Sequence, residues 1–251
     1  MIIENRAGGV ATVQMNDPER RNAFSMPMRL ALLETFRALE ADMSVRVVVF
    51  TGGAKNFCVG GDITAMGHQD IGPALERMRI VHDLVRLLAQ SSKPLICAVE
   101  GWAVGGGLAL ALLCDTIVAG ETARFKAGFG EIGMLGDTGI LHTLPSRVGI
   151  GRSRQILLYN EVISAAQAQQ WGMIDVVVPG GEAINEGTRL AEVLERKAPL
   201  PMALTRSIFA AGLENVLARE REVQAMLLSS ADHAEGKMAF FEKRTPVFRG
   251  A

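Results

Sequence analysis

The sequence predicts an α/β fold, in which short buried strands alternate with helices and a helical region completes the chain. Two apolar, β-branched runs, residues 46–51 and 95–99, each end close to glycine and are typical of buried strands. Apolar residues at helical spacing lie between them, and strand patterns stop after Gly181. We therefore expect an α/β core followed by helices.

The chain opens with a predicted hairpin and helix. Residues 2–5 and 10–15 are strand-like and flank Arg6-Ala7-Gly8-Gly9, where paired glycines supply the positive φ angles of a tight turn. Ser25 and Pro27 are typical of a helix cap and first turn, and an apolar stripe predicts a helix from about residue 27 to 43.

The later elements follow from the same patterns. Ser164 and Gln167 form a capping box for a helix that ends near Gly172. The other core elements are helices over 75–88, 108–114 and 140–148 and strands over 116–119 and 174–178. Further helices are predicted over 182–197, 201–211, 214–230 and 235–243. The charged run 219–222 is interpreted as a solvated helix face.

Composition excludes several classes of partner. The chain has 26 Lys and Arg against 27 Asp and Glu, so no basic excess is available to neutralise nucleic acid or an anionic membrane. Aromatic residues make up 5%, which argues against stacking platforms for bases. A small-molecule partner is expected, bound mainly by backbone groups.

Cysteine and histidine usage indicates neither disulfides nor metal. Cys58, Cys97 and Cys114 are odd in number and lack CxxC spacing, and the four histidines have no metal-like spacing. The N-terminus lacks a basic region followed by an apolar core, and the longest uncharged stretch is too short to span a bilayer. We expect a cytoplasmic protein without a metal site.

Two glycine-rich loops, residues 57–63 and 101–107, carry the strongest functional indication. Both follow apolar strands, where ligands commonly bind. Glycine lets a backbone N–H approach a ligand oxygen, and two converging N–H groups would form an oxyanion hole. The alternative is that the glycines only permit tight turns and close helix packing. A dinucleotide fingerprint is incomplete, because position 110 is Leu where it needs Gly.

These loops and other segments resemble the crotonase, or enoyl-CoA hydratase/isomerase, superfamily over nearly the whole chain. The similar segments are Arg21-Asn22-Ala23-Phe24 and residues 47–63, 93–115, 165–179 and 239–248. The resemblance implies a crotonase-like spiral of ββα units over residues 1–195 and a helical C-terminal trimerisation region over 196–251. It also implies a homotrimer or dimer of trimers that binds acyl-CoA thioesters, with coenzyme A as part of the substrate and no separate cofactor.

The resemblance places the oxyanion-hole donors at Gly61 and Gly106, but it does not supply the two glutamates of hydratases. Their positions here are Ala109 and Phe129. Asp137 instead matches the acid of epoxyphenylacetyl-CoA isomerase-like enzymes, where one carboxylate can move a proton between two carbons. The favoured function is therefore an acyl-CoA isomerase, for an enoyl double bond or a ring epoxide.

Alternatives stay open at this point. One is an enoyl-CoA hydratase of fatty-acid β-oxidation with displaced acids that include Glu131, a residue otherwise interpreted as a loop or surface carboxylate. Another is a non-catalytic acyl-CoA-binding protein. Asp137 itself could be a turn or cap residue. Asp137 also matches the nucleophile of a related dehalogenase, and only such hydrolytic chemistry would need His68 or His82 as a base.

The resemblance also suggests residues that contact the substrate. Backbone at Ala23, Phe24, Asp62 and Ile63 would hold coenzyme A, although Asp62 is also typical of a helix cap. Phe240 and Lys243 would approach the adenine end, on the same or a neighbouring subunit, with Lys243 paired to phosphate. The expected apolar lining is Met26, Met66, Phe129, Met134 and Leu135.

Overall fold

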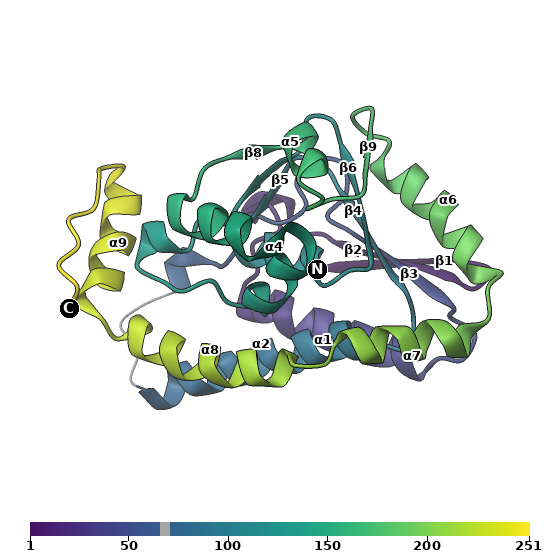
Figure 1. Cartoon of the computed structure of the whole chain (residues 1–251), viewed down its shortest axis with the longest axis horizontal. Coiled ribbons are helices and arrows are strands. Elements are labelled where there is room, and N and C mark those ends of the chain that lie inside the picture. Colours follow the sequence, from purple (N-terminus) through teal and green to yellow (C-terminus); the bar gives the residue numbers. More distant parts are fainter. Residues whose placement is uncertain (66–70) are drawn as a thin grey trace.

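The computed structural model describes residues 1–65 and 71–251 and has an α/β architecture with a helical C-terminal region, as predicted (Figure 1). Within these ranges the strands form a six-stranded sheet in the order β1-β2-β3-β4-β6-β9 and a three-stranded sheet in the order β5-β7-β8. The larger sheet consists of β1 (Ile2–Ala7), β2 (Val10–Met15), β3 (Val47–Thr51), β4 (Leu95–Val99), β6 (Thr116–Gly120) and β9 (Val176–Val178).

The strand directions bring the two glycine-rich loops to one edge of the larger sheet. β1 and β2 pair antiparallel as the predicted hairpin, whereas β2, β3, β4, β6 and β9 are parallel neighbours. Since β3 and β4 are adjacent and parallel, the segments that follow them begin at the same edge of the sheet.

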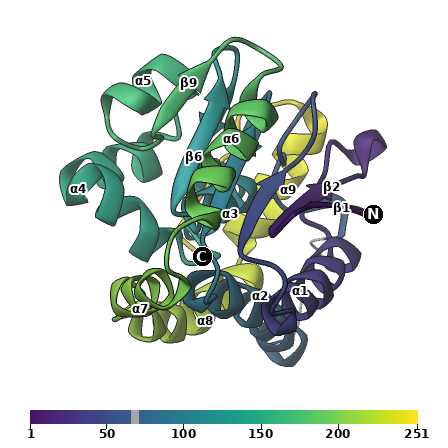
Figure 2. The same ribbon diagram turned by 90° about the vertical axis from the view of Figure 1, so that its right-hand side faces the viewer.

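Both faces of the larger sheet are covered by helices (Figure 2). Val48 and Phe50 belong to the main core, which includes residues of α1 (Met26–Ala41), α2 (Ile71–Gln90) and α3 (Gly106–Leu112). Val47 and Val49 belong to a second cluster with α6 (Ala183–Glu195) on the opposite face. This explains why every residue of β3 is buried. Four of the five are apolar, and the hydroxyl of the fifth, Thr51, donates a hydrogen bond to the Ala98 carbonyl.

The three-stranded sheet was not predicted. It is formed by β5 (Trp102–Val104), β7 (Arg124–Lys126) and β8 (Ile163–Ser164), and the sequence interpretation treated the first of these as part of a loop. Two or three residues are too few to show strand alternation, so pairing with distant segments decides their conformation. Three short 3-10 turns also lie in the described residues: η1 (Pro18–Arg20), η2 (Ile63–Ala65) and η3 (Gly130–Ile132).

The helices confirm most predicted elements to within a few residues. Ser25 caps α1 by accepting a hydrogen bond from the Met28 amide (3.5 Å), as expected. One helix differs, because it continues past the predicted end at residue 148 through a kink at Gly149 (φ 75°). The remaining helices are α4 (Ile140–Tyr159), α5 (Ala165–Gln170), α7 (Pro199–Phe209), α8 (Leu213–Leu228) and α9 (Ala231–Glu242). None of the helices in the described residues is long and apolar enough to cross a bilayer.

Arg206 ties the C-terminal helices to the core. Its buried guanidinium, on α7, pairs with the Asp115 carboxylate and donates from Nε to the Ser91 carbonyl (3.0 Å). Nη2 donates to the Leu88 carbonyl at the end of α2 (2.6 Å). A single side chain thus connects α7 with α2 and with Asp115, the residue before β6. These contacts hold α7 against α2.

We predict that Arg206→Met lowers the free energy of unfolding by about 2 kcal/mol, because two carbonyls and a partly buried carboxylate lose a charged donor. Urea unfolding followed by circular dichroism measures the difference. Arg189→Met is the matched control, since Arg189 is exposed on α6, and it should change stability by less than about 0.5 kcal/mol. Equal effects of the two substitutions would contradict this role of Arg206.

Candidate active site

The two glycine-rich loops lie side by side because the first pairs with β5. The Cys58 amide donates to the Trp102 carbonyl (3.0 Å), and the Val104 amide donates to the Cys58 carbonyl (2.9 Å). Gly60 (φ +89°) lies two residues after Cys58, and its backbone is so close to β5 that an added Cβ would lie 2.8 Å from the Val104 carbonyl oxygen. Glycine is required at this position by both backbone conformation and space.

Gly61 and Gly106 present their backbone to the same cavity, which has a volume of about 200 Å³. Within the described part of the chain the Gly61 amide has no hydrogen-bond acceptor. Gly106 is the first residue of α3, where amides have no acceptor within the helix. The preceding Gly105 amide donates to the Lys126 carbonyl (2.9 Å), which fixes the orientation of this loop.

The structure gathers most of the predicted site residues around this cavity. Its lining includes Gly61, Gly106, Asp137, Phe24, Ile63, Phe129, Met134 and Phe240. Ala23, Asp62, Lys243, Met26 and Leu135 lie outside the lining, and Met66 and His68 lie outside the described residues. Phe240 reaches the cavity from α9 of the same chain. Asp62 caps η2, since its carboxylate accepts a hydrogen bond from the Thr64 amide (3.0 Å).

Asp137 lies in a left-handed turn before α4. Thr138 (φ 60°) and Gly139 (φ 77°) both have positive φ, which is a strained conformation for a β-branched residue. The N-cap of α4 is Gly139, so Asp137 is not its cap residue. One carboxylate oxygen of Asp137 accepts from Thr138 Oγ1 and the other from Gln224 Nε2, both at 2.9 Å.

A buried carboxylate on α8 holds this strained turn. Glu220 accepts hydrogen bonds from the amides of Thr138 (2.7 Å) and Gly139 (3.0 Å) and pairs with His82 Nε2 (2.9 Å). Glu220 is 1% exposed and His82 is 2% exposed. Burial raises the pKa of Glu220, and the hydrogen bond to His82 opposes this rise.

The interpretation of residues 219–222 as a solvated face is thus wrong for Glu220. Its neighbours Arg219, Arg221 and Glu222 are exposed, but Glu220 follows the buried Leu213 and Leu217 at helical spacing. That spacing is the sequence pattern that could have identified it. His82 is not in the cavity lining and is engaged with Glu220.

Arg29 is a cavity residue that the sequence reasoning missed. It is 4% exposed, and its Nε donates to the Phe24 carbonyl (3.0 Å) while its guanidinium stacks over the Phe24 ring, 4.6 Å from the centroid. Burial lowers the pKa of Arg29 to about 9, so the group stays charged at neutral pH. Arg29 precedes the buried Leu33 and Phe36 by four and seven residues, which places a charge on the apolar face of α1.

Two further charged residues in the lining neutralise each other. Lys126 Nζ lies 2.7 Å from a Glu131 carboxylate oxygen, and both residues border the cavity. Glu131 is exposed, as predicted, yet it faces the site. In the residues that the structure describes, no group of three His, Cys, Asp or Glu side chains is arranged to hold a metal ion.

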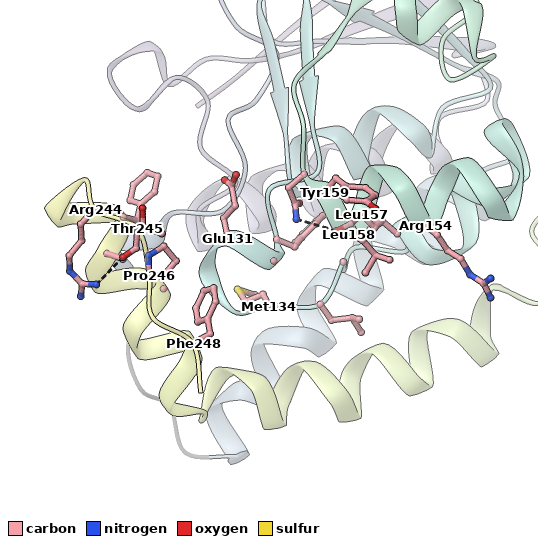
Figure 3. Close-up of a pocket in the computed structure, with 18 of the residues that line it drawn as sticks. Glu131, Met134, Arg154, Leu157, Leu158, Tyr159, Arg244, Thr245, Pro246 and Phe248 are labelled. Atoms are coloured by element: carbon pink, nitrogen blue, oxygen red, sulfur yellow. Dashed lines mark hydrogen bonds between the residues drawn. The ribbon is translucent and has the colours of Figure 1, made fainter. Parts of the chain in front are cut away.

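A larger hollow of about 970 Å³ adjoins the cavity and shares Phe129, Glu131, Met134 and Phe240 with it. Lys243 lies in this hollow. Figure 3 shows Thr245, Pro246 and Phe248 of the C-terminal segment on one side and Leu157 and Tyr159 of α4 on the other. An extended ligand could therefore continue from the cavity towards α9.

We predict that Glu220→Ala lowers the free energy of unfolding by about 3 kcal/mol, because two buried amides and His82 lose their acceptor. Glu222→Ala, two residues away on the exposed face, is the matched control and should be neutral within about 0.5 kcal/mol. Thermal and urea unfolding measure both. A neutral Glu220→Ala variant would show that the turn holds its conformation without this carboxylate.

The chain matches known proteins along nearly its whole length. The family model described as enoyl-CoA hydratase/isomerase matches residues 5–251. Two Escherichia coli relatives are each 34% identical and align with 99% of this chain and 98% of their own: a 1,2-epoxyphenylacetyl-CoA isomerase and a 2,3-dehydroadipyl-CoA hydratase. A crystal structure of an enoyl-CoA hydratase from Mycobacterium avium subsp. paratuberculosis covers 99% of this chain and 98% of its own, with a TM-score of 0.89 and 30% identity. The cavity with its paired glycine amides thus lies in a crotonase fold, and the chain belongs to the enoyl-CoA hydratase/isomerase family.

Proposed function

We propose that this family member is an acyl-CoA isomerase that shifts an enoyl double bond or rearranges a ring epoxide, with Asp137 as the proton shuttle. The observation that carries the proposal is that Asp137 lines one cavity with Gly61 and Gly106. The positions of the two hydratase glutamates hold Ala109 and Phe129, which cannot transfer protons.

The proposed reaction begins at the thioester carbonyl. Its oxygen would accept hydrogen bonds from the Gly61 and Gly106 amides, which stabilise negative charge as the enolate forms. For an enoyl substrate, Asp137 removes a proton from one carbon of the acyl chain and returns it to another, so the double bond moves and the mass is unchanged. Gln224 and Thr138 would hold the Asp137 carboxylate in place for both transfers.

The relatives support this activity and a hydration reaction equally, since an isomerase and a hydratase are each 34% identical. One observation favours the second candidate, a hydratase that uses Glu131. This carboxylate lines the same cavity and is exposed enough to contact water. Its ion pair with Lys126 argues against it, because that contact occupies a carboxylate oxygen that would have to activate water.

The proposed contacts with coenzyme A follow the cavity and the adjoining hollow. Phe24, Ile63 and Phe240 lie where the acyl end and its pantetheine arm would pass. Lys243 in the hollow would meet a phosphate as a point charge.

We predict that Asp137→Asn reduces isomerisation by about two to four orders of magnitude, because the amide cannot accept the proton. The measurement follows product mass and double-bond position with matched 2-enoyl-CoA and 3-enoyl-CoA thioesters. Glu131→Gln is the control and should retain activity. An active Asp137→Asn variant would contradict the proposal.

Other outcomes of the same experiment identify the alternatives. A product heavier by one water, lost in Glu131→Gln and retained in Asp137→Asn, would establish the hydratase. Tight binding of acyl-CoA thioesters without turnover across a panel of acyl groups would instead indicate a non-catalytic binding protein.

A further inference from the structure

Arg29 is a buried cation that borders the cavity. Its Nε is satisfied by the Phe24 carbonyl, but Nη1 has no partner in the described part of the chain. No carboxylate among these residues lies within ion-pair distance of Arg29. Leaving a charged donor buried and unpaired is costly, so such a group indicates a ligand atom that completes it.

The charged side chains of the described residues that line the cavity are Arg29, Lys126, Glu131 and Asp137, and only two of them form an ion pair. Lys126 and Glu131 pair with each other, and Asp62 lies beside Arg20 (3.9 Å). Arg29 and Asp137 remain, and they interact electrostatically without forming an ion pair. The Asp137 oxygens are instead hydrogen-bonded to Thr138 and Gln224. Within the described residues Arg29 is thus left without a direct anionic partner.

Arg29 lies close to the proposed thioester position. The Phe24 ring is next to both: Arg29 stacks over it, and a Cβ added at Gly106 would lie 3.1 Å from a ring atom. Since Arg29 is 4% exposed and borders the cavity, an anion can reach its guanidinium only from the cavity side. An acyl group bound at the proposed thioester position would carry such an anion into the same cavity.

We propose that the substrate is an acyl-CoA whose acyl group carries a carboxylate, and that the Arg29 guanidinium binds this carboxylate. The inference rests on the proposed acyl-CoA binding in this cavity and adds a substrate class to it. Arg29 is thereby a specificity-determining residue. A charge-assisted hydrogen bond in a buried site discriminates strongly, because the neutral analogue leaves the cation without a partner.

The first experiment measures binding, so it does not depend on turnover. Isothermal titration compares saturated acyl-CoA thioesters of equal chain length that end in a carboxylate, its methyl ester or a methyl group. We expect the wild-type protein to bind the carboxylate about ten- to a hundredfold more tightly than the ester. If the wild-type protein bound the carboxylate no more tightly than the ester, the inference would be overturned. This comparison needs no protein variant.

Two variants then assign the preference to Arg29. Arg29→Met should abolish the preference while free coenzyme A, whose phosphates are the other anions of the ligand, binds as before. Arg29→Lys should retain part of the preference, because the charge remains. Arg37→Met on the exposed face of the same helix is the matched control and should leave the preference unchanged. A full preference in Arg29→Met, or an equal loss of coenzyme A affinity, would contradict the assignment.

The result is separable from the proposed catalysis. A carboxylate preference that depends on Arg29 stands even if Asp137→Asn proves active or no acyl group turns over. Conversely, Asp137-dependent isomerisation of methyl-ended and carboxylate-ended thioesters at equal kcat/KM would support the isomerase and refute the role of Arg29.

Discussion

The pairing of Cys58 with β5 is the constraint on which the site depends. Two backbone hydrogen bonds, to Trp102 and from Val104, carry the segment after β3 alongside the segment after β4. Only glycine tolerates the resulting distances: a Cβ on Gly60 would meet the Val104 oxygen, and one on Gly107 would lie 2.3 Å from the Cys58 oxygen. Because these positions are glycines, the two loops present backbone amides to the cavity. Backbone amides are suitable donors to an acyl oxygen.

Asp137, which lines the same cavity as these amides, is positioned by a different region. Asp137 occupies a turn in which Thr138 adopts an unfavourable positive φ angle. Helix α8 stabilises this turn through hydrogen bonds with Glu220 and Gln224. The C-terminal helices thus take part in the site as well as covering the core. Whether they also form a trimer interface stays a prediction, as do the boundary near residue 195 and the cytoplasmic location.

Much of the fold could be predicted because its elements are long and regular. The fully buried runs of β3 and β4 and the apolar stripe of α1 each reveal their conformation within a few residues. The strands β5, β7 and β8 could not be found, because segments of two or three residues adopt strand geometry only through their partners. The resemblance suggested Gly61, Gly106 and Asp137, and the structure places all three around one cavity. No sequence pattern pointed to Arg29, and Glu220 belonged to a run that was interpreted as a solvated face.

The sequence by itself determined the α/β class, the order of most elements, the family and the glycine and acid positions that suggest acyl-CoA chemistry. Only the tertiary structure decided what surrounds them. Whether Glu220 is solvated or buried beneath Asp137, and whether Arg29 faces water or the cavity, depends on which helix packs against each one. The physical reason is that the sequence around a charged residue does not show what will surround it in the fold. The partners of Glu220, for example, lie on elements that are distant along the chain.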